Sequence, residues 1–229
     1  MSTNSSNDSC ILAIIGDGSV GKSSLIAAFR NDNFQKIYKQ TVGCDFYEKV
    51  VTLSGRTISL RVWDIGGQSM NSKNLPEYLS SSDLVFIVYD VTNRESFANV
   101  EDWLSLAMKY SPQADKHIVG NKVDLIGTRQ VTAKQHDNFI LDRDEVKGGV
   151  FMSAKTGENV VKAFYKASGE RLGIKVSAHE LGFYDKVLTA HIEKDLEEDR
   201  TKYADDIERE DREAEERKNA KKSGPCICS

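Results

Sequence analysis

The sequence predicts an α/β fold in which helices cover both faces of a doubly wound, mostly parallel sheet of six strands. Three observations support this prediction. Short apolar segments typical of strands alternate with segments of helical spacing, which is the pattern of βαβ units. The first apolar segment leads directly into a glycine-rich turn and then a helix. A polar residue follows each of four predicted strands, at Asp17, Asp64, Asn121 and Ser153. Their loops should converge at the carboxyl edge of the sheet, where such sheets bind ligands.

The individual elements follow from hydrophobic patterning in chain order. Strands are predicted over 10–15, 49–53, 57–63, 84–89, 116–120 and 150–152. Helices are predicted over 22–30, 94–110, 132–142 and 158–172. The stretches 31–45 and 64–82 are polar and irregular, and the second should hold some helix near its end. Alternation on either side of Ser54-Gly55 makes the second and third strands an antiparallel hairpin.

The chain divides into an arm, one domain and a tail. Residues 1–9 are polar and predict a disordered arm that lacks the apolar core of a secretory signal. Residues 10–174 hold the predicted strands and helices and form the domain. Residues 175–229 form a charged tail. Between Asp185 and Lys222 there are 14 acidic and 10 basic residues, which leaves 21 of each elsewhere. The tail therefore carries the whole net charge of −4.

Composition argues against several classes of protein. Without a basic excess, no nucleic-acid partner is expected. No apolar run approaches the ~20 residues needed to span a bilayer. The cysteines do not form a disulfide framework, which favours a reducing compartment; they are Cys10, Cys44, Cys226 and Cys228. The four histidines are scattered without ligand spacing, so no metal site is assigned to them.

A phosphate-binding loop is the first functional motif. The spacing is G-x-x-x-x-G-K-S, in the residues Gly16, Asp17, Gly18, Ser19, Val20, Gly21, Lys22, Ser23 and Ser24. Glycines permit a tight turn whose N–H groups surround phosphate oxygens, and the following helix adds the positive end of its dipole. Lys22 should reach the β- and γ-phosphates, and the Ser23 hydroxyl suits Mg²⁺. The alternative is an ordinary glycine-rich turn between a strand and a helix.

The second motif follows the strand that ends at Trp63. Asp64 should lie near Mg²⁺, and the Gly67 N–H should face a γ-phosphate. The Gln68 amide can orient an attacking water, which makes Gln68 the candidate catalytic residue. The alternative is a polar turn in which Asp64 caps a helix.

The third motif selects the base. In Asn121-Lys122-Val123-Asp124, a buried Asp124 carboxylate can accept from both N1–H and the N2 amine of guanine. Adenine lacks this pair of donors and would leave the carboxylate unpaired, a penalty that can reach ~10⁴-fold. The residues Ser153, Ala154 and Lys155 should close the pocket, with the Ala154 N–H facing guanine O6.

Together the motifs resemble those of Rab-type small GTPases of the Ras superfamily, over roughly 10–173. The resemblance implies the P-loop GTPase fold, GTP and GDP as ligands, and Mg²⁺ held by Ser23, Thr41 and Asp64. It also places Phe34 where the family stacks an aromatic ring on guanine. The stretches 87–92 and 153–160 match further Rab signatures.

Other implications concern partners. Phe46, Trp63 and Tyr78 have the spacing of the aromatic triad that Rab effectors contact, although core packing would also explain Phe46 and Trp63. The segment after Gln68 departs from the usual Rab pattern, because Ser69–Asn74 lacks the expected arginines. This segment resembles one divergent Rab subgroup, the twenty-eighth in the usual numbering. An exchange factor, a GTPase-activating protein and effectors are implied, without their identities.

The resemblance implies slow hydrolysis of GTP to GDP and phosphate, accelerated by an activating protein. Lys22 would offset phosphate charge, and Gly18 would leave room for Gln68. An alternative function is a GTP-bound scaffold that does not hydrolyse. An ATP-dependent P-loop enzyme is disfavoured by Asp124 and by the lack of a lid-like insertion.

The tail is the last feature. Oppositely charged residues four apart predict a long solvated helix over 185–222, which could be frayed, a spacer or a partner-binding element. The terminal Cys-Ile-Cys-Ser fits C-a-a-X with farnesyl on Cys226. Its Cys-x-Cys also resembles the Rab signal for two geranylgeranyl groups, on Cys226 and Cys228. A prenyltransferase or escort protein is implied. The expected location is the cytoplasmic face of intracellular membranes, endosomal by the subgroup resemblance, with a cytosolic pool.

Overall fold

The computed structural model describes residues 8–30, 44–66 and 73–184. The strands are β1 (Asp8–Ile15), β2 (Cys44–Leu53), β3 (Arg56–Ile65), β4 (Leu84–Asp90), β5 (Asp115–Asn121) and β6 (Val146–Phe151). The helices are α1 (Lys22–Arg30), α2 (Leu75–Ser80), α3 (Arg94–Ala98), α4 (Val100–Tyr110), α5 (Ala133–Leu141) and α6 (Val160–Arg171), with a 3₁₀ turn, η1, at Ile126–Thr128. The predicted α/β fold is therefore confirmed.

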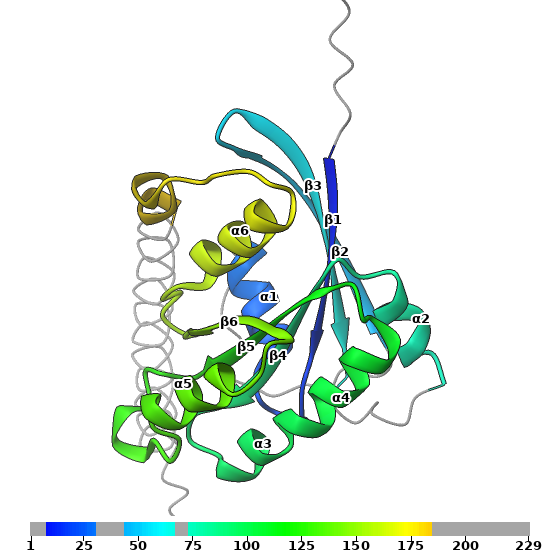
Figure 1. Cartoon of the computed structure of the whole chain (residues 1–229). Coiled ribbons are helices and arrows are strands. Elements are labelled where there is room, and N and C mark those ends of the chain that lie inside the picture. The colour runs from blue at the N-terminus through cyan, green and yellow to red at the C-terminus, as the bar shows by residue number, and fades with distance from the viewer. Residues whose placement is uncertain (1–7, 31–43, 67–72, 185–229) are drawn as a thin grey trace, which may run out of the picture. The chain divides into compact units, whose positions relative to one another are not determined.

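The six strands form one sheet in the order β2-β3-β1-β4-β5-β6. Only β2 runs antiparallel to its neighbour; the other pairs are parallel. Figure 1 shows α1 and α6 on one side of the sheet and α2 and α4 on the other. On the first side Phe29 stacks on Phe164 at 4.4 Å between ring centroids. On the second side Trp103 and Leu104 of α4 are buried in the main core cluster. Burial on both faces explains why the central strands are continuously apolar.

The hairpin is longer than the sequence predicts. The prediction that the second strand begins at residue 49 is wrong, because β2 starts at Cys44 and pairs with β3 from that residue on. Its first residues are exposed or half-buried without alternation, so hydrophobic patterning does not mark them. The turn at Ser54-Gly55 has positive φ at both residues, 47° and 80°, which matches the twist of a two-residue hairpin.

The predicted helix over 94–110 is interrupted. It forms α3 and α4, which meet at Asn99. The Asn93 side chain caps α3 by accepting from the backbone N–H groups of Glu95 and Ser96. By contrast, α5 begins as predicted, because Thr132 and Gln135 form a capping box. The last predicted strand is also longer, since β6 starts at Val146 and includes two glycines that weaken its apolar pattern.

Packing continues past residue 174. Residues 178–184 are helical, and Leu181 is buried. The Tyr184 hydroxyl donates to the Thr52 carbonyl at 3.0 Å, so this segment contacts the β2–β3 hairpin. The predicted tail helix over 185–222 lies outside the described residues. Among the helices within them, none combines the length and the apolar character that crossing a membrane requires.

Candidate functional site

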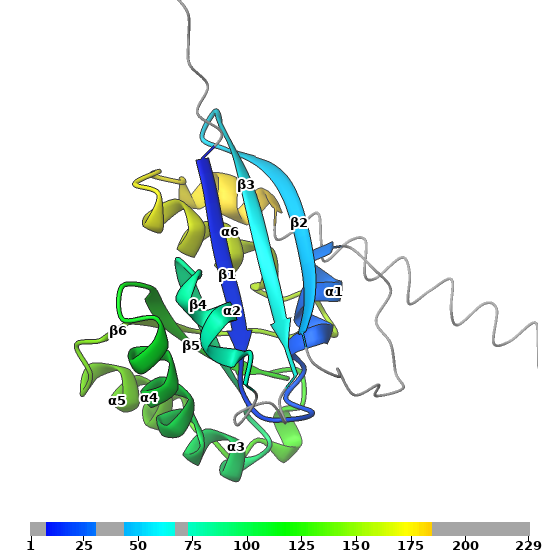
Figure 2. The same cartoon turned by 90° about the vertical axis from the view of Figure 1, so that its right-hand side faces the viewer.

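The predicted loops meet at one end of the sheet. Figure 2 shows the arrowheads of β1 and β3 pointing to the end at which α3 lies. Hydrogen bonds join the elements there: Asn121, the last residue of β5, donates to the Val20 carbonyl at 2.8 Å. Asp64, near the end of β3, accepts from the Ser23 hydroxyl of α1. Residues far apart in the sequence therefore form a single constellation.

The phosphate loop turns tightly against β4. Gly16 has φ of 137°, and a Cβ on it would lie 2.1 Å from the Val88 carbonyl oxygen, so glycine is required. Lys22 is buried, and its Nζ donates to the carbonyls of Gly16 at 2.8 Å and Asp17 at 2.7 Å. Burial lowers the pKa of Lys22 to about 8, against the opposing charges of Asp64 and Asp17. The loop thus holds an ammonium group at its centre.

The loop also supplies a helix N-terminus. Lys22 is the first residue of α1, and the first turn of α1 has no acidic residue. The positive end of the helix dipole is therefore not offset by a carboxylate on the helix itself. With the buried ammonium beside it, this end of α1 can bind phosphate.

Ser23 and Asp64 supply oxygen atoms suited to Mg²⁺. The Ser23 hydroxyl donates to an Asp64 carboxylate oxygen, and Asp64 is buried. A hydroxyl and a carboxylate are hard ligands of the kind that Mg²⁺ prefers. The described part of the predicted Mg²⁺ site therefore fits the ion. Thr41, its third predicted ligand, lies outside the described residues.

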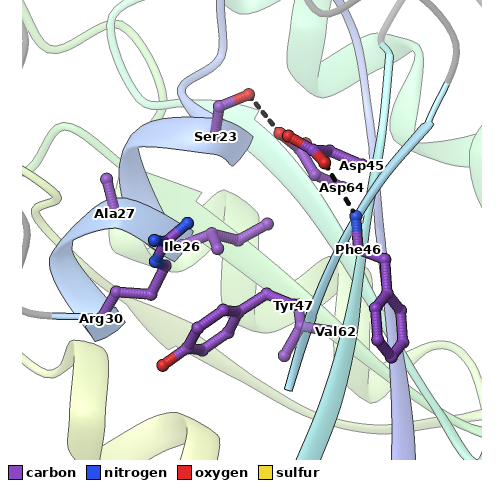
Figure 3. A pocket seen from close by; sticks show the side chains of 9 residues that line it. All are labelled: Ser23, Ile26, Ala27, Arg30, Asp45, Phe46, Tyr47, Val62 and Asp64. Atoms are coloured by element: carbon purple, nitrogen blue, oxygen red, sulfur yellow. Dashed lines mark hydrogen bonds between the residues drawn. The ribbon is translucent and has the colours of Figure 1, made fainter. Parts of the chain in front are cut away.

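A small cavity adjoins this pair between α1 and β2 (Figure 3). Its volume is about 110 Å³, which is below the ~300 Å³ usual for small-molecule sites. In Figure 3, Ser23 and Asp64 lie at one end and Arg30 and Tyr47 at the other. The lining residues are Ser23, Ile26, Ala27, Arg30, Asp45, Phe46, Tyr47, Val62 and Asp64.

Asn121 connects the base loop to the phosphate loop. Its side chain is buried; besides donating to Val20, it accepts from the Ala154 N–H at 3.2 Å. A Cβ on Gly21 would lie 2.4 Å from the Asn121 amide nitrogen, which explains why glycine occupies that position. Lys122 adds a second connection, because its Nζ donates to the Ser19 carbonyl at 2.8 Å. These hydrogen bonds therefore fix the position of the base loop relative to the phosphate loop.

Asp124 is positioned as an acceptor. Its side chain is 13% exposed, and one carboxylate oxygen accepts from the Ser153 hydroxyl at 2.7 Å. Lys155 lies 3.9 Å from the other oxygen. Ser153 is fully buried and in turn accepts from the Thr156 N–H, which fixes the turn after β6. The Ala154 N–H, expected to face guanine O6, bonds Asn121 in this structure.

Five predicted residues cannot be placed. Phe34, Thr41, Gly67, Gln68 and Cys226 lie outside the described residues. The aromatic triad can be placed: Phe46 and Trp63 have ring centroids 4.7 Å apart, and Trp63 and Tyr78 are 5.3 Å apart. Phe46 is 47% exposed, whereas Trp63 and Tyr78 also pack on the core.

Sequence reasoning missed three residues at this site. Asp90 forms an ion pair with Lys122 at 2.7 Å. Asn99 and Trp103 both donate to the Asp17 carboxylate. Asp90 lies in the stretch 87–92, which matches a Rab signature, and Trp103 lies within the predicted helix over 94–110. Helical spacing identifies Trp103 as buried, but it does not show where the indole N–H points.

Comparison with known proteins agrees with this geometry. The family model described as "Ras family" matches residues 11–172. The Ras-related protein Rab-28 of Caenorhabditis elegans is 38% identical over 175 residues, which cover 74% of this chain and 70% of that protein. The Ras-related protein RIC1 of Oryza sativa subsp. japonica is 39% identical over 162 residues, covering 69% and 78% respectively. The chain belongs to the Ras family, as a Rab-type small GTPase.

Proposed function

We propose that this protein is a slow GTP hydrolase that acts as a membrane-attached switch in vesicle or endosomal traffic. The observation that supports guanine-nucleotide binding is the position of the Asp124 carboxylate, which accepts a hydrogen bond from Ser153. In the same base loop, Asn121 donates a hydrogen bond to the phosphate loop. An acceptor whose side chain is only 13% exposed favours a base with two adjacent N–H donors, which guanine has and adenine lacks.

The chemistry is attack of water on the γ-phosphate of GTP, giving GDP and phosphate. The Lys22 ammonium offsets negative charge on the β- and γ-phosphates, and the Gly67 N–H donates to the γ-phosphate. Gln68 orients the attacking water through its amide. A Mg²⁺ ion held by Ser23, Asp64 and Thr41 would add positive charge beside the phosphates. In this proposal turnover is slow until an activating protein supplies further groups in trans.

Thr41 and Gly67 make the site a switch. Both contact the γ-phosphate in this proposal, so their segments adopt one arrangement with GTP and another after hydrolysis. Exchange factors, activating proteins and effectors would read the difference. The row formed by Phe46, Trp63 and Tyr78 is the proposed effector surface.

The test is GTP turnover by the full chain with Mg²⁺ present. Gln68→Leu should lower turnover about tenfold or more while GTP binding persists, because the water loses its orienting amide. Gln113→Leu is the matched control, since Gln113 is exposed in the loop before β5. Unchanged turnover in Gln68→Leu would remove Gln68 from this role. A wild-type protein that binds GTP without any turnover would favour the scaffold function.

Membrane attachment through Cys226 completes the proposal. A single farnesyl group anchors only marginally, so the basic residues near 217–222 would supply a second, electrostatic contact with anionic lipid. A prenyltransferase or escort protein would deliver the chain to the cytoplasmic face of endosomal membranes and maintain a cytosolic pool. The mass of the mature C-terminus tests this: two lipids, on Cys226 and Cys228, would rule out the C-a-a-X form.

A further inference from the structure

Asp17 places a carboxylate inside a loop that binds phosphate. A negative charge there should repel the ligand, unless the side chain is held away from it. Both oxygens of this carboxylate have donors, one from Asn99 at the junction of α3 and α4 and one from Trp103 within α4. Trp103 Nε1 donates to Oδ1 at 2.8 Å, and Asn99 Nδ2 donates to Oδ2 at 2.7 Å.

We propose that Asp17 is a positioning residue, which fixes the phosphate loop on α4 through Asn99 and Trp103 and thereby slows nucleotide release. The inference rests on the proposed guanine-nucleotide function. Asp17 does not recognise the nucleotide through its carboxylate in this proposal; it sets the shape of the loop that does.

The two donors are themselves fixed. Trp103 is 1% exposed, in the core formed by α2, α4 and the sheet, so its indole cannot turn without disrupting packing. Asn99 lies where the predicted continuous helix breaks into α3 and α4. Its backbone still belongs to the helical ladder, because Asn99 N–H donates to Glu95 and Trp103 N–H donates to Asn99. The two helices therefore meet at Asn99, a residue that contacts the phosphate loop.

The same residue also connects α4 to the phosphate-binding lysine. The Asp17 carbonyl accepts from Lys22 Nζ at 2.7 Å, while its carboxylate faces Asn99 and Trp103. The main chain of Asp17 therefore contacts Lys22, and its side chain contacts Asn99 and Trp103. Loss of the carboxylate removes the connection to α4 and leaves the Lys22 contact without that support.

Release of a fluorescent GDP analogue in Mg²⁺ measures the effect. We expect Asp17→Ala to release it about tenfold faster, because two hydrogen bonds to a charged acceptor are lost. Asp17→Asn keeps an acceptor for Trp103 and should fall between Asp17→Ala and wild type. Trp103→Phe should accelerate release about threefold. Asp17 and Trp103 act through one contact. The double variant Asp17→Ala/Trp103→Phe should therefore release the GDP analogue more slowly than the product of the two single effects predicts.

Tyr89→Phe is the control. It also removes a buried hydrogen bond, between the Tyr89 hydroxyl and His136 Nδ1 at 3.1 Å, in which no residue of the phosphate loop takes part. This variant should lose stability and keep the wild-type release rate. Loss of stability alone therefore does not reproduce the expected result.

Three outcomes overturn the inference. The first is a release rate of Asp17→Ala equal to that of wild type, and the second is a fully multiplicative effect in the double variant. The third comes from NMR of the two tryptophan indole N–H groups without nucleotide: an unmoved Trp103 signal in Asp17→Asn and Asp17→Ala would show no contact. If the wild-type protein binds no guanine nucleotide, the proposed function fails, whereas the indole signal still tests the contact.

Discussion

Two sets of polar side chains, one at each end of the sheet, lie in different surroundings. At the carboxyl ends of the parallel strands, Lys22, Asn121 and Ser153 are buried and bonded to other loops. At the opposite end, Asp83 and Arg171 form an ion pair at 3.6 Å with side chains 36% and 32% exposed. Both sets form polar contacts, but only Lys22, Asn121 and Ser153 are shielded from water; the Asp83–Arg171 pair is not.

This difference in exposure to water predicts different effects of substitution at the two positions. A buried polar group without a partner costs about 1–3 kcal/mol, so each side chain at the carboxyl end is held in place by its neighbours. An exposed ion pair contributes only about 0–1 kcal/mol. We therefore expect substitutions at the carboxyl end to change nucleotide binding, and like substitutions at the other end to change little.

The largest effect is expected for Asp124→Asn. The amide presents a donor where guanine requires acceptors, so GDP affinity should fall by roughly 10³-fold or more. Asp83→Asn makes the same chemical change at the other end, where Asp83 accepts from the Ile11 N–H at 2.9 Å. Equilibrium titration of both variants with GDP checks the pair. Similar losses in the two would contradict the assignment of Asp124 to the base.

The second prediction concerns His136, a buried residue of α5 that packs against Tyr89 of β4 and Phe151 of β6. Burial lowers the pKa of His136 to about 4, so the folded protein keeps it neutral where an unfolded chain takes up a proton. Stability should be full above pH 6.5 and fall as pH drops toward 4, by up to about 3 kcal/mol. Below that pH both states are protonated and no further loss arises from this residue.

Urea unfolding between pH 7 and pH 4 measures this dependence. His136→Gln should flatten the curve, because an amide does not titrate. His179→Gln changes an exposed histidine and is the control. Burial of His117, whose pKa is also lowered to about 4, leaves part of the slope in place. A His136→Gln curve parallel to wild type would mean that folding does not lower the pKa of His136.

The fold and the motif positions could be predicted from the sequence because both depend on local pattern. Apolar runs predicted the central strands, and helical spacing predicted the helix over 132–142 that the structure shows as α5. Local sequence pattern does not predict features that depend on residues far apart in the chain. The start of β2 at Cys44 depends on pairing with Ile65, and no hydrophobic alternation accompanies it.

The site was predicted as a list of residues but not as a network. Spacing identified Asn121 as a base-loop residue, whereas its packing against Gly21 depends on the approach of two loops 100 residues apart. The Asp17 contact with Trp103 has the same character, since helical periodicity reports burial and not the direction of a hydrogen bond. Such contacts arise only after the sheet has brought the loops together.

The smallest effect is expected at Ser54, and it gives the closest comparison between the two ends. Ser54 Oγ donates to the Lys175 carbonyl and contacts the Glu180 carboxylate, at 2.9 and 3.0 Å. Ser153 Oγ also makes two bonds, to Asp124 and from the Thr156 N–H. Ser54 is exposed and Ser153 is fully buried.

Serine-to-alanine substitution therefore removes the same atom and the same number of bonds at each position. Ser54→Ala should lower the free energy of unfolding by less than about 1 kcal/mol, because water replaces the lost partners. Ser153→Ala should cost more, and it should also weaken GDP binding about tenfold by releasing Asp124. Urea unfolding and GDP titration of both variants decide the matter. Equal losses of stability would show that burial does not set the difference between the two ends, and an equal loss of GDP affinity would place the hairpin tip within reach of the nucleotide site.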